Sequence, residues 1–357
     1  MSNIPNNIKE KIGLHLHNKS GHPIKILKDH MYKYFDSLEY KFDKFDEFEP
    51  FVSVENNFDL LRIPKEHPSR SIHDTYYVND DTVLRTHTSA HQNELLGKGY
   101  SNFLVTGDVY RKDEIDSRHY NIFHQTEMVV LVPDDKNPEQ ELKKILHGFI
   151  KYLFPNNEYR FNTDYFPFTD PSFEVEVKFG DKWLEILGCG VIHREILDKL
   201  NIKQQGIAIG FGIERLAMIL FDIPDIRYFW TNDPRFMNQF KHENIIKFIP
   251  YPKLNPITKD ISFWIPDLEV NNENENFNWK NINDFYEWIR EVCDNNVADV
   301  CVLDKFYHSK KNKYSMTFRF TIESDLNETN PSKLETYAND VMIKMSNFLK
   351  EKGYTIR

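Results

Sequence analysis

Apolar residues recur at helical spacing in two segments of the first half of the chain. After Pro23 they are Ile24, Leu27, Met31, Tyr34 and Phe35. After Pro138 they are Leu142, Ile145, Leu146, Phe149, Ile150 and Leu153. Proline suits the first turn of a helix, and a spacing of three or four residues lines up one apolar face. Each segment is therefore predicted to be an amphipathic helix that begins at its proline.

Three segments show patterns typical of strands, at 103–110, 126–132 and 173–187. The last is the clearest, because Phe and Val at the odd positions from 173 to 179 alternate with Glu174, Glu176 and Lys178. Gly180-Asp181 supplies a two-residue turn before the chain returns, so the segment is predicted to form a hairpin.

The next elements are predicted to be a helix near 191–200, a short strand at 206–209 and a second helix opened by Gly210-Phe211-Gly212. Long antiparallel strands with helices set apart favour an α+β fold over a doubly wound one. Pro250, Pro252 and Pro256 indicate a linker. The first domain is therefore predicted to span 1–249.

The segment after the linker, 250–357, has a distinctive order of predicted elements. A strand at 258–265 precedes an Asn-rich loop and a helix that begins near Ile282. Strands at 297–306 and 314–323 follow, then a helix from about Leu334 and a short last strand. This β-α-β-β-α-β order predicts a ferredoxin-like domain.

Composition narrows the class of protein. The chain has 357 residues, of which 40% are hydrophobic and 28% charged, and these values are typical of a globular protein with a sizeable core. The three cysteines, Cys189, Cys293 and Cys301, show no CxxC spacing, which excludes a disulfide framework and a zinc ribbon. A net charge of -10 argues against bulk coating of nucleic acid but permits a local basic surface.

The first candidate for chemistry is the segment from His87 to Gln92, which contains two histidines four residues apart. A zincin would need glutamate after the first histidine, where Thr88 stands. The remaining interpretations are a polar helix cap formed by Thr88 and Ser89, or donors and acceptors that face a small polar molecule.

The second candidate joins Gly107–Arg111 with Phe123–Glu127. A strand, a charged loop and a returning strand would bring Arg111, Phe123 and Glu127 together. Arg111 suits an anion, because a guanidinium forks onto phosphate or carboxylate, although an arginine in such a cluster alone is more often part of a surface ion pair.

The third candidate is the Phe166–Phe168 ledge and the hairpin behind it. Core packing alone would explain the two phenylalanines. Glu185 stands between apolar neighbours and is predicted to share a side with Trp183 and Leu187, where a carboxylate needs a partner, for which a cation is one candidate. The fourth candidate, Gly210–Arg215, would place Arg215 in the first turn of a helix, within reach of a nucleotide.

These clusters together and in this order resemble the single-chain, organellar type of phenylalanyl-tRNA synthetase, a family of class II aminoacyl-tRNA synthetases. The resemblance covers nearly the whole chain. It is carried by THTSAHQ, GDVYRKDEID, HYNIFHQTEM, YFPFTDPSFEVEV, WLEILGCG, GFGIERLAMILFDIPDIRYFW and, in the last third, YPKLNPITKDISFW. It implies a class II antiparallel-sheet catalytic domain at 1–249 and a ferredoxin-like anticodon-binding domain at 250–357.

The resemblance also implies roles for individual residues. Arg111, Arg215 and Glu185 would be catalytic, with Mg²⁺ on Glu185. Bound L-phenylalanine would contact His87, Ser89, Ala90, His91, Gln92, Gln125, Thr126, Glu127, Phe166, Phe168, Ala208 and Ile209. ATP would contact Arg111, Arg118, His119, Tyr120, Phe123, Glu185 and Arg215, with adenine between Phe123 and Arg215.

Two segments depart from the family pattern. Ile207 and Ile209 stand where the family usually has aromatic residues, and Asp170 replaces a longer carboxylate. The shape of the phenylalanine site is therefore open at this stage.

The expected partners are L-phenylalanine, ATP and tRNA-Phe, with no second subunit and no membrane. Either tRNA binding or a solvated hairpin tip would explain the basic group Lys305, Lys310, Lys311, Lys313 and Arg319. Two rival functions stay open: a non-catalytic RNA-binding descendant of a synthetase, and an enzyme for another aromatic amino acid. The expected compartment is the mitochondrial matrix, with a plastid-type organelle as the alternative, although no Arg-rich presequence precedes residue 20.

Overall fold

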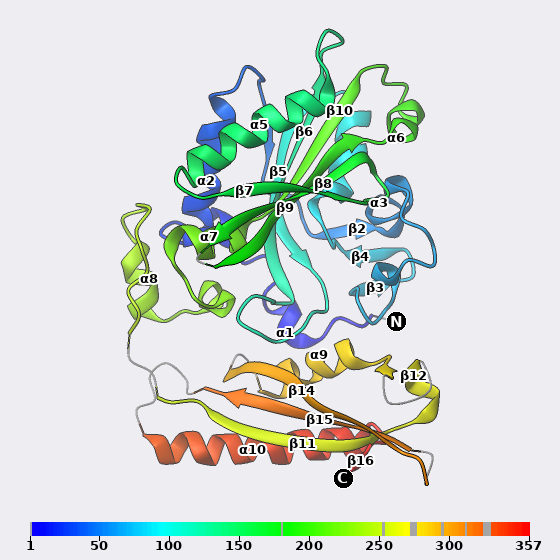
Figure 1. Ribbon diagram of the computed structural model, residues 1–357, viewed down its shortest axis with the longest axis vertical. Coiled ribbons are helices and arrows are strands. Elements are labelled where there is room, and N and C mark those ends of the chain that lie inside the picture. The colour runs from blue at the N-terminus through cyan, green and yellow to red at the C-terminus, as the bar shows by residue number, and fades with distance from the viewer. Residues whose placement is uncertain are drawn as a thin grey trace. The chain divides into compact units, whose positions relative to one another are not determined.

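A computed structural model describes residues 2–179, 181–251, 254–271, 277–293, 296–310, 313–323 and 330–357 (Figure 1). The chain divides into two compact units. The first unit comprises Met1–Ile4, Lys11–Arg111 and Ile122–Ile249, and the second comprises Pro5–Glu10, Lys112–Asn121 and Pro250–Arg357. The division after residue 249 lies at the predicted linker, of which Pro252 is outside the described residues. Two short segments of the first 249 residues cluster with the C-terminal part.

A seven-stranded sheet forms the centre of the first unit, in the order β1-β5-β6-β10-β9-β8-β7. Only β1 and β5 are parallel neighbours, and all other pairs are antiparallel. The strands are β1 (Asp43–Phe45), β5 (Asn102–Tyr110), β6 (Ile122–Val132), β7 (Tyr159–Asp164), β8 (Thr169–Phe179), β9 (Lys182–Ile192) and β10 (Gln205–Gly212). The predicted α+β class with long antiparallel strands is confirmed.

Two helices cover one face of this sheet, α2 (Pro23–Asp36) and α5 (Pro138–Leu153). Both begin at the predicted proline, and a side chain before each proline, His22 or Asn137, caps the first turn. Phe35 of α2 stacks on Phe149 of α5, and both rings contact Phe211 of β10. The odd-numbered side chains of β10 therefore point toward the helices, because side chains alternate along a strand.

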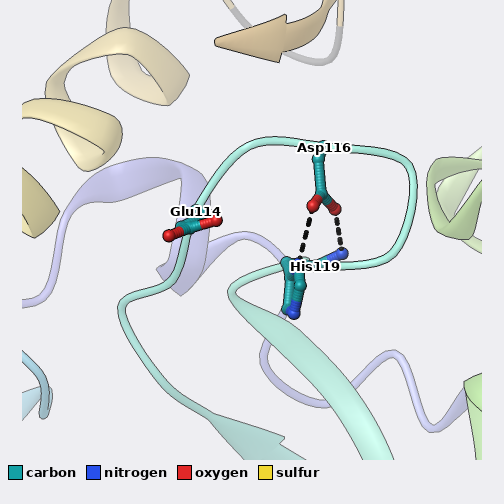
Figure 2. Close-up of side chains that lie close together, drawn as sticks. All are labelled: Glu114, Asp116 and His119. Carbon is teal, nitrogen blue, oxygen red and sulfur yellow. Dashed lines mark hydrogen bonds and ion pairs between the residues drawn. The ribbon is translucent and has the colours of Figure 1, made fainter. Parts of the chain in front are cut away.

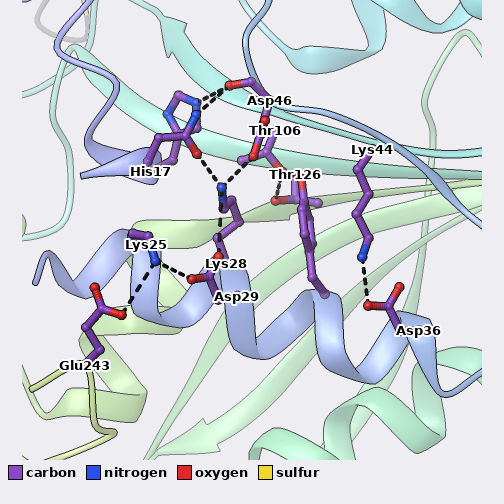
Figure 3. A network of polar contacts seen from close by, with 12 residues as sticks. His17, Lys25, Lys28, Asp29, Asp36, Lys44, Asp46, Thr106, Thr126 and Glu243 are labelled. Carbon is purple, nitrogen blue, oxygen red and sulfur yellow. Dashed lines mark hydrogen bonds and ion pairs between the residues drawn. The ribbon is translucent and has the colours of Figure 1, made fainter. Parts of the chain in front are cut away.

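A polar network ties α2 to the back of the sheet (Figure 3). The Tyr32 hydroxyl lies 2.8 Å from the Thr106 hydroxyl, which lies 2.8 Å from that of Thr126. Lys28 donates to Asp46 at 2.6 Å. These contacts satisfy polar groups that α2 would otherwise bury without partners.

Two predicted boundaries near the ends of β9 and β10 are wrong. Val191 and Ile192 belong to β9, and helix α6 is only Arg194–Lys199. The segment Gly210-Phe211-Gly212 continues β10, where Phe211 pairs with both Thr126 and Leu187, and helix α7 begins at Ile213. Pairing on both sides extends the strand through glycines that predict a break when they are read alone.

A small three-stranded sheet packs beside the large one in the order β2-β4-β3, with β2 at Phe51–Ser53, β3 at Tyr77–Asn79 and β4 at Thr82–Leu84. The remaining helices of the first unit are α3 (Val54–Asn57), α4 (Gln92–Gly97), α7 (Ile213–Phe221) and α8 (Pro234–Phe240), with 3₁₀ turns η1 (Leu16–Asn18), η2 (Asp59–Leu61), η3 (Pro68–Arg70), η4 (Thr88–His91) and η5 (Ile226–Trp230).

The second unit contains a four-stranded sheet in the order β14-β15-β11-β16. Its elements are α1 (Asn6–Lys9), β11 (Ile257–Ile265), η6 (Asp267–Glu269), β12 (Val270–Asn271), β13 (Asn278–Trp279), α9 (Ile282–Cys293), β14 (Val297–His308), β15 (Lys313–Ile322), α10 (Pro331–Glu351) and β16 (Thr355–Ile356). Apart from the small β12–β13 hairpin, the chain order is the predicted β-α-β-β-α-β, and the core lies between the sheet and helices α9 and α10.

Candidate active site

The face of the large sheet opposite α2 and α5 carries Phe123, Gln125 and Glu127 of the second cluster. Register aligns Glu127 of β6 with Gly210 of β10, Gly210 with Gly188 of β9, and Gly188 with Glu174 of β8. Residues directly opposite each other share a face, so this row has carboxylates at its ends and glycines between them. A Cβ at Gly210 would meet only one atom within 4 Å. The two glycines therefore leave the middle of this face without side chains.

Apolar side chains, which form an apolar wall, lie against the part of the sheet that contains these two glycines. The rings of Phe166 and Phe168 stack at 5.8 Å, and a Cβ on Gly188 would lie 3.0 Å from Phe166 Cζ. Phe168 packs against the cluster that contains Ala208. The predicted phenylalanine contacts Phe166, Phe168 and Ala208 thus surround one glycine-lined stretch of the sheet.

The η4 turn brings the first cluster onto β6. The Ser89 hydroxyl donates to the Glu127 carboxylate, and Thr88 N–H donates to Gln125 Oε1 at 3.3 Å. In the described part of the chain, neither amide atom of Gln92 reaches a hydrogen-bond partner, although both are shielded from solvent. The shielded ring nitrogens of His87 lie near the Asn57 backbone but make no hydrogen bond of good geometry. Buried polar groups nearly always find partners, so these atoms point to a ligand.

Burial shifts the pKa values of this group. It raises the pKa of Glu127 to about 7, although the hydrogen bonds from Ser89 and Thr88 act to lower that pKa. Burial, together with the charge of Arg111, lowers the pKa of His87 to about 3. At neutral pH the His87 ring is uncharged, and the Glu127 carboxylate would gain from a nearby cation.

Arg111 follows β5 directly. Its Nε donates to the Thr86 carbonyl oxygen at 2.7 Å, and its guanidinium lies 5.2 Å from the centre of the Phe123 ring. Phe123 and Glu127 share a face of β6, so the predicted convergence of Arg111, Phe123 and Glu127 on one surface is observed.

Glu185 pairs with Arg215, at 3.2 Å between Oε2 and Nη1. A bulge in the hairpin aligns Glu185 with Glu176 but Leu187 with Val175, so Glu185 and Leu187 lie on opposite faces. The prediction that they share a side is therefore wrong. Glu185 instead lies on the active face with Glu174, whose pKa is raised to about 7 by burial and by the carboxylates of Glu185 and Asp164.

Thr126 and Ile209 turn to the other face of the sheet. The Thr126 hydroxyl bonds to Thr106 beneath α2, and Ile209 alternates with Gly210 and Ala208. Only the backbone of these two predicted phenylalanine contacts can therefore reach the other face, where Glu127 and Ala208 lie. His91 is engaged elsewhere too, since its Nε2 lies 3.1 Å from Arg85 Nη1 and its ring stacks on Phe48. Ala90 packs in the apolar cluster of Phe58 and Val83.

Arg118, His119 and Tyr120, the other predicted ATP contacts, belong to the second unit. His119 Nδ1 lies 2.8 Å from Asp116 Oδ2 (Figure 2). Despite burial, hydrogen bonds from His119 and the Arg118 N–H lower the pKa of Asp116 to about 2. Glu114, Asp116 and His119 form the only tight group of metal-ligand atoms among the described residues, and it does not include Glu185.

The predicted basic group of the second unit is largely engaged within that unit. Arg319 makes two bonds to Asp260, both at 2.8 Å, and Lys305 donates to the Phe277 carbonyl at 2.9 Å. Lys310 is exposed, and Lys311 lies outside the described residues. Lys313 lies 6.0 Å from the ring of Trp264.

Sequence reasoning missed Arg85, which is completely buried beside the site. Its guanidinium donates to both the carbonyl and the carboxylate of Asp108, each at 2.7 Å. Asp108 also accepts from the Tyr110 hydroxyl. The one local signal of the Arg85–Asp108 pair in the sequence was a charged residue, Arg85, directly after the apolar Val83 and Leu84.

The chain matches the family described as tRNA synthetases class II core domain (F) over residues 7–240. Phenylalanine--tRNA ligase, chloroplastic/mitochondrial, of Arabidopsis thaliana is 45% identical over 362 residues, covering 97% of this chain and 82% of that protein. Phenylalanine--tRNA ligase, mitochondrial, of Mus musculus is 38% identical over 364 residues, covering 90% of this chain and 78% of that protein. The chain thus belongs to the organellar phenylalanine–tRNA ligases of the class II aminoacyl-tRNA synthetase family.

Proposed function

We propose that this chain activates L-phenylalanine with ATP, forming phenylalanyl-adenylate and pyrophosphate, and then transfers phenylalanine to tRNA-Phe. The relatives named above carry this ligase activity in their names, and none supports a non-catalytic RNA-binding protein. We further propose that the protein acts in the mitochondrial matrix as a monomer. Among the described helices, none has the length and apolar character needed to cross a bilayer.

One observation carries the proposal: polar atoms of His87 and Gln92 are shielded from solvent without a well-formed hydrogen bond, and the η4 turn between these two residues bonds through Ser89 to the buried Glu127 carboxylate. A zwitterionic amino acid would satisfy both kinds of group. Its ammonium would pair with Glu127, and its carboxylate would accept from His87 and Gln92. The apolar wall of Phe166, Phe168 and Ala208 would then receive an aromatic side chain.

The chemistry follows from position and charge. The carboxylate of phenylalanine is already ionised, so its attack on the α-phosphate of ATP needs no general base. Arg111 would hold the α-phosphate beside that carboxylate and stabilise the charge that develops there. Arg215 and Phe123 would contact the adenine.

The donor set on β8 and β9 fits a divalent metal. Glu185 and Glu174 offer the hard oxygen ligands that Mg²⁺ prefers, and a cation would relieve the repulsion that raises the pKa of Glu174. Bound there, Mg²⁺ would neutralise phosphate charge. We therefore propose Glu185, with Glu174 beside it, as the residues that hold the metal with ATP.

The direct test of the function is ATP–pyrophosphate exchange with phenylalanine, with tyrosine and without an amino acid, followed by charging of tRNA-Phe. We expect phenylalanine-dependent exchange and slower tyrosine-dependent exchange, because an apolar site rejects an added hydroxyl by only about 10²-fold. Exchange without phenylalanine dependence would refute the proposed substrate.

Phenylalanine binding is expected to depend on the ionisation of Glu127. The pKa of Glu127 is about 7 in the folded protein, and its ordinary value is 4.5. Its contribution to the free energy of unfolding is therefore fully present below pH 4.5 and is lost as the pH rises through 7. Binding of the ammonium requires the opposite, ionised form. KM for phenylalanine should therefore rise about tenfold per pH unit as the pH falls below 7. In Glu127→Gln, KM should be higher and independent of pH over this range, whereas an unchanged profile in the variant would contradict the assignment.

The open face of the second unit suits single-stranded RNA. Arg357 Cζ lies 4.6 Å from the centre of the Phe306 ring and 5.5 Å from that of Trp264, and Arg357 Nη1 donates to the Ser315 hydroxyl. Register places Phe306 and Trp264 on either side of Ser315. Aromatic rings that alternate with a guanidinium are a common surface for unpaired bases. We propose that tRNA contacts this row, with Lys310 and Lys313 at its edge.

Trp264→Ala is expected to weaken tRNA-Phe binding by about fivefold or more, because each base stacked on an aromatic ring contributes about 1–3 kcal/mol. Exchange with ATP and phenylalanine should not change. Tyr152→Ala, which removes an exposed aromatic ring from the first unit, is the matched control. Equal tRNA affinity of the two variants in a filter-binding assay would move the RNA surface elsewhere.

A further inference from the structure

Asn57 is completely buried at the end of α3, far in sequence from every candidate active-site residue. Both ends of its side-chain amide contact the same residue. Its Nδ2 donates to Thr86 Oγ1 at 2.9 Å, and its Oδ1 accepts from Thr86 N–H at 3.0 Å. Two bonds from one rigid amide hold Thr86 at its N–H and at its hydroxyl, and so restrict rotation of the backbone that carries its carbonyl.

Thr86 in turn contacts the proposed catalytic arginine. Its carbonyl oxygen accepts from Arg111 Nε at 2.7 Å. The bond to Nε sets the plane of the guanidinium, because Nε lies at the root of the planar fork. The chain of contacts thus runs from the Asn57 amide through one residue to the Arg111 side chain.

The surroundings leave this chain little freedom. On one side of Thr86, Arg85 N–H donates to Pro50 O at 2.8 Å, and the Arg85 carbonyl accepts from Tyr110 N–H at 3.0 Å. On the other side stands His87, whose ring nitrogens are shielded from solvent. A rotation of the Thr86 backbone would therefore move its carbonyl oxygen and, with it, the Arg111 side chain that this oxygen holds.

We propose that Asn57 is a positioning residue for Arg111 and acts through the backbone of Thr86. The inference rests on the role of Arg111 at the α-phosphate that is proposed above. Asn57 touches neither substrate in this arrangement. Its contribution is the direction in which the guanidinium points before ATP binds, and errors of about 1 Å in such positions cost about 10²-fold in rate.

A double-mutant cycle on ATP–pyrophosphate exchange tests the proposal. Asn57→Ala is expected to lower kcat/KM for ATP by about tenfold or more in the wild-type background. In the Arg111→Lys background, which lacks Nε, the same change should cost less than about twofold, because the residue that Asn57 orients is already gone. A purely structural asparagine would cost the same factor in both backgrounds, and that result would overturn the proposal.

Two further variants keep the test decisive if Asn57→Ala fails to fold. Asn57→Asp keeps the shape and the acceptor for Thr86 N–H, and Thr86→Val removes only the hydroxyl. Both should show the same dependence on Arg111, with smaller losses, and equal losses in both backgrounds would count against the proposal. Asn93→Ala is the matched control, since Asn93 Nδ2 donates to the Leu60 carbonyl nearby without a contact to Thr86. Its effect on exchange should be identical in both backgrounds.

The Arg111→Lys variant distinguishes the proposed role of Arg111 from the proposed positioning role of Asn57. If that variant alone exchanges at the wild-type rate, the proposed role of Arg111 fails. If Arg111→Lys is slow and Asn57→Ala is additive with it, only the positioning role of Asn57 fails.

Discussion

Replacement of Arg111 by alanine is expected to lower phenylalanine-dependent exchange by about 10²–10³-fold, the usual cost of one donor that stabilises charge in a transition state. Arg111 is held against the Phe123 ring and the Thr86 carbonyl, so its guanidinium is oriented by the protein before ATP arrives. The loss should therefore fall mainly on kcat. Measured exchange within tenfold of wild type would remove Arg111 from the proposed mechanism.

Arg160→Ala is the matched control for this experiment. Arg160 lies on the edge strand β7, where it pairs with Glu176 and stacks on the Trp183 ring at 4.3 Å. It is half-exposed and has no place in the proposed chemistry. Its replacement should leave the exchange rate nearly unchanged, which distinguishes the loss of Arg111 from a general loss of positive charge.

The second large effect is expected on stability. Arg85→Leu should lower the free energy of unfolding of the first unit by about 3–5 kcal/mol, because it leaves the buried Asp108 carboxylate without its cation. The Arg85 guanidinium is tightly enclosed, since a Cβ on Gly107 would lie 2.1 Å from its Nη2, and in the variant the Tyr110 hydroxyl would stay as a neutral donor to Asp108. Urea unfolding, followed by circular dichroism, measures the change.

Two comparisons make the stability experiment specific. Adding Asp108→Asn to Arg85→Leu should restore part of the loss, because the uncompensated buried charge is then removed. Arg160→Ala breaks an exposed pair and should cost no more than about 1 kcal/mol. An Arg85→Leu variant as stable as Arg160→Ala would show that the buried pair contributes little.

Local patterns predicted the elements whose signals are themselves local. Helices α2 and α5 begin at Pro23 and Pro138 as expected, because proline and the apolar period act within a few residues. The order of elements in the second unit was predicted for the same reason. The strand through Gly210 to Gly212 was missed, because its stability comes from β6 and β9, which flank it.

The same limit applied to the candidate site. The sequence alone identified the residue types that bind a zwitterion and a phosphate, and Arg111, Phe123 and Glu127 do share a surface. The sequence alone did not show which residue of the pair Gln125 and Thr126, or of the pair Ala208 and Ile209, has its side chain on the substrate face. The two residues of each pair are neighbours in the chain. Alternation puts neighbours on opposite faces, and only the helices packed on one face decide which of them meets the substrate.

The sequence by itself determined the family, the proposed chemistry and the order of the elements, because each depends on residue types at short spacing. Only the tertiary structure decided the bulge that separates Glu185 from Leu187, the burial of Arg85 against Asp108, and the contacts of Asn57. Asn57 and Thr86 are 29 residues apart, and Thr86 and Arg111 are 25 apart. Contacts over such distances depend on which strands pair, in which register, and on how the elements meet in the core, and the apolar period of a single element does not specify them.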